Sequence, residues 1–433
     1  MSWELPFRTA SSFLILISSF GRFHNSPTHF LCPMTPLFKK FLGMNWLLVL
    51  NIAGLVVFGV YAIFNASAHK DEAEFAFKWR DQIRWVMLGL PFFFAASLID
   101  YKWVRWACLP MYLAGIGGLV AVLLIGVEIG GNKAWIRVGG QMVQPSQFAI
   151  MSGILILAVI FGELPRLHPV FRRPWLRIML AGMLAGVPAA MVIKEDLGSG
   201  LVWGPVFLSM MLVGSIPFRY LITMLLGVIS VVPLVYVFAL KPYQQARINS
   251  TWYMLTNQLE KVDMQNEGWV AKHLQIAVST GGLEGKGPES KKVPDQASIH
   301  RTFFPHESIN DFIFGVIAEE FGFRGSVLVL SGMLLLLLQS VFVAFCARDQ
   351  LGRLITVGVI AMFFVHTFQN AGMNLVMLPV IGLPMPFVSY GGTFVIVTLF
   401  LMGMVQSVWV HRNISAAKKK RAVNSVRDDD EED

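Results

Sequence analysis

Asp311 stands where a polar stretch of the sequence gives way to an apolar one, in the run Ser308-Ile-Asn-Asp-Phe-Ile-Phe-Gly315. A carboxylate at such a boundary can act as a general base, because partial desolvation raises the pKa of a carboxyl group. An aspartate at the start of a helix can equally serve as an N-cap, since its side chain accepts hydrogen bonds from the first backbone N–H groups. The residues alone leave both roles open for Asp311.

Glu319 and Glu320 are carboxylates inside the apolar stretch that follows. Carboxylates within a membrane normally face a cavity or a partner. Glu319 lies eight residues beyond Asp311, which is about 12 Å along a helix axis. This separation exceeds that of the two carboxylates of a hydrolase that cleaves one glycosidic bond. We therefore predict a structural salt bridge for the pair, to Arg324 or to another helix.

A glycine-rich run, Gly281-Gly-Leu-Glu-Gly-Lys-Gly287, precedes this region. Its backbone could form a nest that binds phosphate, with Lys286 supplying a positive charge. The strand–loop–helix setting of a nucleotide P-loop is not recognisable around it. A flexible turn is the alternative.

Residues 378–392 read Leu-Pro-Val-Ile-Gly-Leu-Pro-Met-Pro-Phe-Val-Ser-Tyr-Gly-Gly. Three prolines and a Gly-Gly pair cannot continue a regular spanning helix. Non-helical backbone at membrane depth is tolerated only where it is buried in protein or lines a water-filled cavity. The pattern predicts a re-entrant segment that shapes a site, in an enzyme or in a transporter.

The elements that must hold these residues are membrane-spanning helices. The chain is 55% hydrophobic and only 14% charged, whereas soluble domains carry about 25% charged residues. About ten apolar runs approach the length needed to cross the hydrocarbon core of a bilayer. They cover residues 46–65, 83–99, 105–127, 146–163, 175–193, 199–215, 218–240, 325–346, 354–372 and 391–411. The predicted fold class is all-α, a polytopic membrane protein with about ten transmembrane helices.

The distribution of basic residues predicts the orientation. Lysine and arginine favour cytoplasmic ends, and the clusters at 166–177 and 418–421 lie in the cytoplasm only if the N-terminus does. Both termini are then cytoplasmic, and the long connection 241–324 is an extracytoplasmic loop. This topology accounts for the net charge of +8, so we do not predict a nucleic-acid partner.

The chain divides into three predicted regions. Residues 1–43 form an N-terminal extension, or the start codon lies further along, with Met34 and Met44 as the candidate starts. Residues 44–412 form the membrane domain, and 413–433 form a disordered, charged cytoplasmic tail. The three cysteines show no paired spacing, which argues against a disulfide framework or a zinc cluster.

Two long motifs carry a resemblance to a known family. The pattern N-x-G-M followed by P-x-x-G-L-P-x-P-F-x-S-Y-G-G runs from Asn370 to Gly392, and D-F-I-F-x-V-x-x-E-E-x-G runs from Asp311 to Gly322. Both are similar to signatures of the SEDS family, named for shape, elongation, division and sporulation. Shorter matches are Trp135-Ile, Gln144-Pro-Ser146, Asp196-Leu-Gly198 and the glycine-rich run 281–287.

The resemblance implies a glycosyltransferase of the bacterial inner membrane that polymerises lipid II outside the cytoplasm. The 4-hydroxyl of one disaccharide attacks the anomeric carbon of another, undecaprenyl pyrophosphate leaves, and the configuration inverts. The resemblance places the family's essential aspartate at Asp311, as general base or acceptor-orienting group. It implies a class B penicillin-binding protein and other elongation-complex membrane proteins as partners. A divalent cation, Mg²⁺ or Mn²⁺, could assist, although the sequence shows no metal-ligand cluster.

Further residues are assigned on the same basis. Arg247 and Lys286 are candidates for pyrophosphate contacts through charge-assisted hydrogen bonds. The other residues expected to bind substrate are Trp135, Glu307, Ser389 and Tyr390. Residues expected to give polar support are Asp196, Glu319, Glu320 and Asn370.

Within the family, the chain resembles the RodA branch more than the FtsW branch. The run Lys241-Pro-Tyr-Gln-Gln-Ala-Arg-Ile248 and the stretch Phe77 to Gln82 with Trp85 carry this similarity.

Two departures concern a charged pair. Gln147 and Ile150 stand where the family usually has glutamate and lysine. Losing both members of a charged pair costs less than losing one, so a divergent site is consistent with a functional enzyme. The alternatives are a lipid-II flippase or other secondary transporter, and a non-catalytic scaffold of the cell-wall synthesis complex.

Overall fold

A computed structural model describes residues 35–67, 77–129, 132–193, 196–238, 240–263, 267–287 and 307–412. The chain forms two compact units that divide after Gly43. In the first unit, a short helix α2 (Pro36–Leu42) begins after Thr35, whose hydroxyl accepts a hydrogen bond from the Phe38 N–H at 3.4 Å. The candidate start at Met34 and the predicted tail 413–433 lie outside the described residues.

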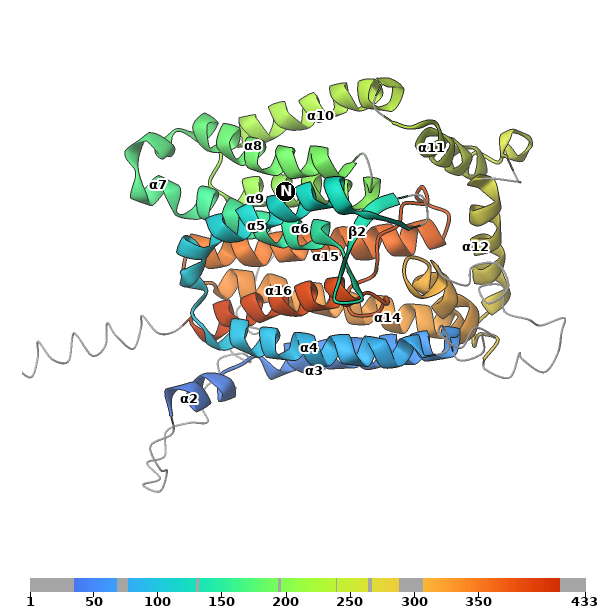
Figure 1. Cartoon of the computed structure of the whole chain (residues 1–433), viewed down its shortest axis with the longest axis horizontal. Coiled ribbons are helices and arrows are strands. Elements are labelled where there is room, and N and C mark those ends of the chain that lie inside the picture. Colours follow the sequence, from blue (N-terminus) through green and yellow to red (C-terminus); the bar gives the residue numbers. More distant parts are fainter. Residues whose placement is uncertain are drawn as a thin grey trace, which may run out of the picture. The chain divides into compact units, whose positions relative to one another are not determined.

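The second unit is a bundle of helices (Figure 1). Its helices are α3 (Trp46–Ser67), α4 (Lys78–Leu98), α5 (Val104–Ile125), α6 (Pro145–Gly162), α7 (Leu164–Leu167), α8 (Pro174–Ile193), α9 (Leu197–Val213), α10 (Phe218–Phe238), α11 (Pro242–Leu255), α12 (Glu267–Gly281), α14 (Ile313–Cys346), α15 (Gln350–Asn374) and α16 (Gly392–Val410). The predicted all-α, polytopic class is confirmed.

Seven helices in the described part of the chain are long and apolar enough to cross a membrane. They are Trp46–Ser67, Tyr101–Ile125, Pro145–Leu167, Pro174–Ile193, Ile313–Cys346, Gln350–Asn374 and Gly392–Val410. Two further apolar helices, Leu197–Val213 and Phe218–Ser230, are shorter, and α4 begins with charged residues. A count of about ten spans therefore stays a prediction.

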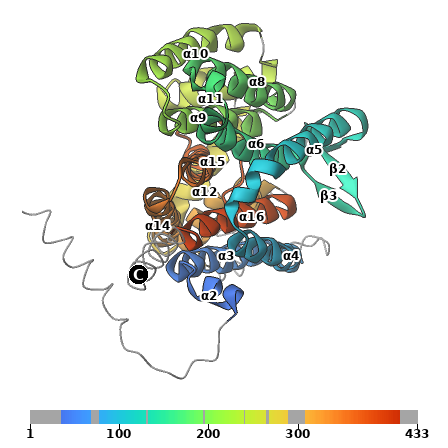
Figure 2. The same cartoon turned by 90° about the vertical axis from the view of Figure 1, so that its left-hand side faces the viewer.

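The core of the bundle is formed by α6, α15 and α16. Between 67% and 78% of the apolar window of these three helices is buried, against 28% to 39% for the other four spans. Viewed end-on, α16 lies between α4 and α15 (Figure 2). Close approach of α16 to α4 requires Gly403, because a Cβ there would overlap the carbonyl oxygen of Phe93. Small residues allow membrane helices to pack in this way.

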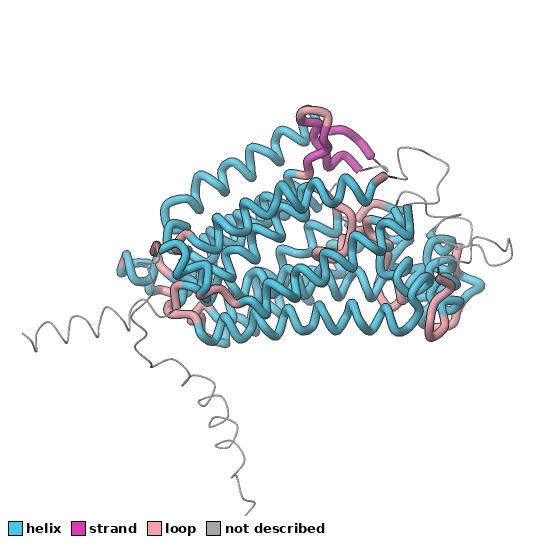
Figure 3. The backbone as a smooth tube through the Cα atoms, turned by 90° about the horizontal axis from the view of Figure 1, so that it is seen from below, coloured by secondary structure: helices cyan, strands magenta, loops and turns pink. Residues whose placement is uncertain are grey.

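A small antiparallel sheet follows α5, at one end of the bundle (Figure 3). Its strands are β1 (Val127–Ile129), β2 (Asn132–Val138) and β3 (Gln141–Val143), in that spatial order. The hairpin between β2 and β3 turns at Gly139 and Gly140, whose φ angles of 57° and 83° favour glycine. The sequence patterns had not predicted this sheet, which carries Trp135 and Arg137.

Helix α14 is interrupted at Gly322, where φ is 62° and ψ is −160°. The break leaves backbone carbonyl and N–H groups of α14 without partners inside the helix. The glycine-rich run 281–287 provides hydrogen-bond partners for these groups. Lys286 N–H and Gly287 N–H donate to the carbonyls of Glu319 and Glu320 at 2.9 and 3.1 Å. In return, Phe323 N–H donates to Gly282 O at 2.8 Å. The run 281–287 and the kink therefore form one hydrogen-bonded unit.

Candidate functional site

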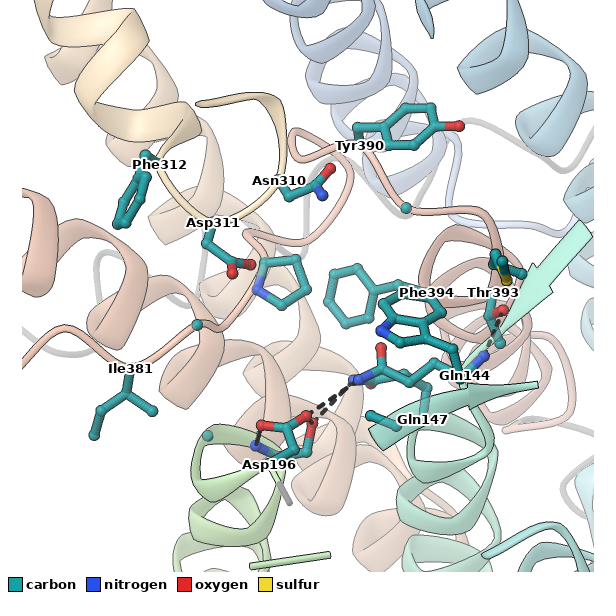
Figure 4. Close-up of a pocket in the computed structure, with 18 of the residues that line it drawn as sticks. Gln144, Gln147, Asp196, Asn310, Asp311, Phe312, Ile381, Tyr390, Thr393 and Phe394 are labelled. Carbon is teal, nitrogen blue, oxygen red and sulfur yellow. Dashed lines mark hydrogen bonds between the residues drawn. The ribbon is translucent and has the colours of Figure 1, made fainter. Parts of the chain in front are cut away.

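A cavity of about 890 Å³ opens at one end of the bundle (Figure 4). Its volume lies toward the upper end of the range typical of small-molecule sites. The lining comes from the start of α4, the small sheet, the starts of α6 and α9, parts of α11 and α12, and residues 310–312 and 379–394. The charge pattern predicts that all these segments lie on the same, extracytoplasmic side.

Asp311 lines this cavity (Figure 4). Helix α14 begins at Ile313, and its N-cap position is Phe312, whose side chain makes no capping hydrogen bond. Asp311 therefore lies one residue before the N-cap position that the sequence offered for it. Its carboxylate packs against Gly382 of the re-entrant segment, so closely that a Cβ on this glycine would overlap Asp311 Oδ2.

Two asparagines on α15 hold the backbone at Asp311. Asn370 Nδ2 donates to the carbonyls of Asp311 and Leu383 at 2.8 and 2.7 Å. Asn374 Nδ2 donates to the same Asp311 carbonyl at 3.3 Å, and its Oδ1 accepts from Gly315 N–H at 3.1 Å. Both side chains are fully buried. Asn370 thus gives the polar support predicted for it, and Asn374 was missed.

The re-entrant segment holds the residues just before Asp311. Ser389 Oγ donates to Asn310 O at 2.6 Å and accepts from Met385 N–H at 2.7 Å. Tyr390 N–H donates to Ile309 O at 2.8 Å. Tyr390 lines the cavity, as expected of a substrate-binding residue. Ser389 is fully buried and is not among the described lining residues, so its geometry supports a structural role instead.

Gln82 on α4 fixes the other side of Tyr390. Its buried amide donates from Nε2 to Ser389 O and accepts at Oε1 from Gly391 N–H, both at 3.2 Å. One side chain therefore bridges the two residues that flank Tyr390. A buried amide at the start of an apolar helix was the signal that could have identified Gln82 as part of the site.

Asp196 is the N-cap of α9 and lies across the cavity from Tyr390 (Figure 4). Its Oδ1 accepts from Ser199 N–H at 3.0 Å, and its Oδ2 accepts from Ser199 Oγ at 2.6 Å and Gln144 Nε2 at 3.1 Å. Burial raises the pKa of Asp196 above its usual value, against the lowering effect of hydrogen bonds from Ser199 and from the Gly198 backbone. Asp196 therefore gives polar support by capping α9 at the cavity wall.

Gln147 and Ile150 occupy the positions of the missing charged pair. Gln147 lines the cavity and donates from Nε2 to Ser199 Oγ at 3.4 Å. Ile150 is buried in the core. The cationic residues among the described lining are instead Lys78, Arg137 and Arg247.

Arg247 and Trp135 lie in the cavity wall, and the substrate contacts predicted for them stay predictions. Arg247, on α11, donates from Nη1 to Val380 O at 3.4 Å, and its guanidinium carbon lies 5.5 Å from the ring centroid of Tyr243. These contacts place its positive charge beside the start of the re-entrant segment, two residues from Gly382.

Lys286 is not among the described residues that line the cavity. Its Nζ lies 2.6 Å from Glu319 Oε1, and the Glu319 side chain is fully buried. Arg324 pairs with Glu284 at 2.8 Å, and the described partner of Glu319 is Lys286, which comes from the loop and not from another helix. The salt bridge predicted for Glu319 nevertheless exists.

The phosphate-nest hypothesis for the run 281–287 is also wrong. The N–H groups of Gly285, Lys286 and Gly287 donate to backbone carbonyls of the protein. Glu319 and Glu320 likewise do not line the cavity. Glu307 begins a short 3₁₀ helix (Glu307–Ile309), and its side chain lies outside what the structure describes.

A divalent cation is a separate question. Among the described residues, no three histidine, cysteine or acidic side chains come together as metal ligands. Mg²⁺ is commonly held by one or two carboxylates together with substrate phosphate, and Asp311 is a carboxylate in the cavity wall. A divalent cation that helps to hold the pyrophosphate stays a prediction.

Two relatives found by comparison with known proteins are both named peptidoglycan glycosyltransferases. A probable peptidoglycan glycosyltransferase FtsW of Geobacter metallireducens is 30% identical over 86% of this chain and 96% of its own length. The peptidoglycan glycosyltransferase RodA of Treponema pallidum is 26% identical over 84% of this chain and 97% of its own length.

Two solved structures share the fold. A chain of a peptidoglycan synthase complex that coordinates polymerization and crosslinking superposes with a TM-score of 0.69, at 27% identity, over 86% of this chain and 99% of that one. The rod shape determining protein RodA of Thermus thermophilus gives a TM-score of 0.60 at 25% identity, over 86% of this chain and 98% of that one.

The family comparison covers the whole membrane domain. The sequence model of the FtsW/RodA/SpoVE family, described as cell cycle protein, matches residues 45–414. This range contains both motifs, the re-entrant segment and every residue named in the cavity wall. The chain therefore belongs to the SEDS family of FtsW, RodA and SpoVE proteins.

Proposed function

We propose that this protein is an inverting peptidoglycan glycosyltransferase that polymerises lipid II into β-1,4 glycan strands. The observation that carries the proposal is the placement of Asp311 in the wall of a large cavity, held by buried hydrogen bonds from Asn370 and next to residues held by Ser389. The names of the relatives from Geobacter metallireducens and Treponema pallidum support the same reaction.

The proposal gives a role to two charged residues, Asp311 and Arg247. Asp311 accepts the proton of the acceptor 4-hydroxyl as its oxygen bonds to the anomeric carbon of the donor. The bond from that carbon to the pyrophosphate breaks, and its electron pair leaves with undecaprenyl pyrophosphate. Arg247 neutralises the charge that develops on this leaving group. Attack from the face opposite the leaving group converts the α-linked donor into a β-linked product.

The catalytic test uses purified protein and lipid II. Asp311→Ala and Asp311→Asn should each abolish polymer, while both variants insert and fold as the wild type does. The asparagine variant is decisive, because it keeps the shape of the side chain and removes the base. Polymer at the wild-type level from Asp311→Asn would refute the assignment. Absence of polymer from the wild-type protein, with and without its partner, would favour the flippase or the scaffold.

The cellular role that we propose is elongation and rod shape. The run Lys241–Ile248, which contains Arg247, supports the RodA branch, while a relative with the name FtsW is 30% identical and one with the name RodA is 26% identical. Expression in cells depleted of their own RodA or FtsW separates the two roles. We expect restored rod shape in the first strain and no restored division in the second; the opposite result would assign the protein to division.

The proposed location is the bacterial inner membrane, with both termini in the cytoplasm. The end of the bundle opposite the cavity supports this orientation, because it carries basic residues that the charge pattern assigns to the cytoplasm. Arg105 pairs there with Glu163 at 3.2 Å, and Lys102 lies 4.0 Å from Asp349.

A class B penicillin-binding protein is the proposed partner, together with other membrane proteins of the elongation complex. The structural similarity to a chain of a complex that coordinates polymerization and crosslinking supports this partnership. The partner should co-purify in mild detergent and raise the polymerisation rate. A rate unchanged by a bound partner would exclude activation, and failure to associate in cells or detergent would exclude the partnership.

A further inference from the structure

The hairpin of β2 and β3 contributes no group to the proposed bond-making step. We propose that this hairpin is the edge at which a membrane lipid enters the cavity, and that Arg137 on it binds the phosphate of that lipid. The inference rests on the proposed function, because lipid II keeps its polyprenyl chain in the bilayer and carries its pyrophosphate at the membrane surface. A phospholipid headgroup offers the same phosphate chemistry, and the experiment separates the two lipids.

The hairpin directly follows a membrane-spanning helix. Leu124 and Ile125 end the span of α5, and 76% and 68% of their surface is exposed, as expected of side chains that face lipid. Lys133 on β2 donates from Nζ to Leu123 O at 2.8 Å, so the strand is held at the end of this helix. The hairpin projects from the side of the bundle beside α5 (Figures 2 and 3). It therefore lies at the level where α5 leaves the hydrocarbon.

The tip of the hairpin combines apolar and cationic side chains. Arg137 and Val138 are both exposed, and the turn that follows them is made of Gly139 and Gly140. An apolar side chain can enter the boundary between headgroups and acyl chains, while a neighbouring arginine keeps its charge among the phosphates. The tip is therefore suited to contact the membrane surface.

Arg137 belongs to the cavity wall as well as to this surface. The hairpin residues that line the cavity are Ala134, Trp135, Arg137, Gly140, Gln141 and Met142. Trp135 and Arg137 lie two residues apart on β2, so their side chains leave the same face of the strand. A phosphate bound by Arg137 is therefore at the edge of the cavity, next to the wall that carries Trp135.

The guanidinium of Arg137 makes no ion pair within the described part of the chain. Glu128, the acidic residue of the sheet, stands opposite Lys133 on β2. Lys133 is four residues from Arg137, about 13 Å along a strand. Asp81 of the cavity wall pairs with Arg84 at 2.8 Å. The planar fork of N–H groups on an arginine matches two oxygens of one phosphate, so Arg137 can bind this anion.

Arg137 and Arg247 act at different places. Arg247 contacts Val380, two residues from the Gly382 against which the Asp311 carboxylate packs. Its charge is therefore beside the reacting carbon, whereas Arg137 lies on the outer hairpin. A contact made at the edge of the cavity is the same before and during bond formation. It strengthens the binding of lipid II and does not raise kcat.

Lipid binding without turnover tests the subsite. Full-length protein in detergent is titrated separately with undecaprenyl pyrophosphate and with phosphatidylglycerol, and each Kd is measured by native mass spectrometry. Arg137→Gln should raise the Kd for undecaprenyl pyrophosphate by about tenfold or more, the effect of a lost hydrogen bond to a charged group. Arg137→Lys, which keeps the charge and loses the fork, should raise it less. Both substitutions are at an exposed position, where the fold tolerates them.

Lys272→Gln is the matched control, because this exposed lysine on α12 is not among the described residues that line the cavity. It should leave both Kd values unchanged. A rise in Arg137→Gln for undecaprenyl pyrophosphate alone assigns the subsite to lipid II, and a rise for both lipids assigns it to lipid phosphates in general. A rise for phosphatidylglycerol alone would refute the entry role. An unchanged Kd for both lipids, or an equal rise in Lys272→Gln, would overturn the proposal.

Kinetics separate this inference from the proposed function. In a polymerisation assay, Arg137→Gln should raise the KM for lipid II by about the same tenfold factor, with kcat little changed. A fall in kcat at an unchanged KM would contradict a role at the cavity edge. If the wild type made no polymer while the Kd difference of Arg137→Gln persisted, the proposed function would fail and the phosphate subsite would stand.

Discussion

The carboxylate of Asp311 and the α-carbon of Gly382 are in such close contact that no side chain fits between them. A Cβ on Gly382 would lie under 3.0 Å from Asp311 Oδ2, a separation that real Cβ atoms essentially never show. Gly382 does not adopt the left-handed φ range that favours glycine, so the backbone there tolerates alanine. Gly382→Ala should therefore displace the carboxylate rather than unfold the segment.

We expect Gly382→Ala to lower kcat by about a hundredfold, since a displacement of about 1 Å in a catalytic group has this effect. The KM for lipid II and the thermal unfolding temperature should change little. Gly204→Ala on α9 is the matched control, because a Cβ there meets nothing within 4 Å. Equal activity of the two variants would show that the contact between Gly382 and Asp311 does not set the rate.

The clamp by Gln82 gives a second prediction. Gln82→Leu keeps the volume of the side chain and removes both hydrogen bonds to the residues flanking Tyr390. We expect kcat to fall by about tenfold or more, because two buried backbone groups lose partners and the segment that orients Asp311 loosens. Steady-state kinetics with purified protein would measure the change.

Gln339→Leu provides the control for this experiment. Gln339 is also a buried glutamine, on α14, but it contacts Asn51 and does not line the cavity. Its replacement should leave kcat unchanged. If both leucine variants lost activity in proportion to their loss of stability, Gln82→Leu would act by destabilising the fold and not by displacing the segment that orients Asp311.

The ion pair between Lys286 and Glu319 gives a third prediction. Lys286→Met leaves a fully buried carboxylate without its lysine, a change that typically costs about 3–5 kcal/mol. The double variant Lys286→Met, Glu319→Met should recover most of this stability, because neither charge remains. Thermal unfolding in detergent measures the loss of stability in the single variant and its recovery in the double variant. A Lys286→Met protein of normal stability with a raised KM for lipid II would restore the pyrophosphate role predicted from sequence.

Membrane topology gives a fourth prediction. Ser279 on α12 and His168 before the 3₁₀ helix Pro169–Arg172 are both exposed. Single cysteines at these positions, in a protein whose native cysteines are replaced, should be labelled by an impermeant reagent from opposite sides. Ser279→Cys should react in intact spheroplasts, and His168→Cys only after lysis. Labelling of both from one side would overturn the topology.

Much of this architecture follows from the sequence because its signals are local. Length and hydropathy identify membrane helices, and the prolines between Leu378 and Phe387 identify a segment that cannot continue a helix. The position of Asp311 at a polar–apolar boundary pointed to a site, and the motif match selected it over the other acidic residues.

Other features depend on which groups meet across the bundle. The glycine-rich run predicted a phosphate nest, but Gly281 and Gly285 instead allow its backbone to contact the carbonyls of Ala318 and Glu320. Spacing along the chain cannot distinguish an N–H group that faces a ligand from one that faces a neighbouring helix. Gln82 and Asn374 escaped prediction for the same reason, since their partners Gly391 and Asp311 lie 309 and 63 residues away in the sequence.

The hydrogen bonds of the re-entrant segment also have a consequence for biosynthesis. Its conformation between Leu383 and Gly391 depends on Gln82 from α4, on Asn310 from the entry to α14, and on α15 through Asn370. The cavity wall extends from Lys78 to Phe394. A nascent chain therefore inserts its early helices without a working site, and the site forms only after the segment before the last helix has left the ribosome and docked.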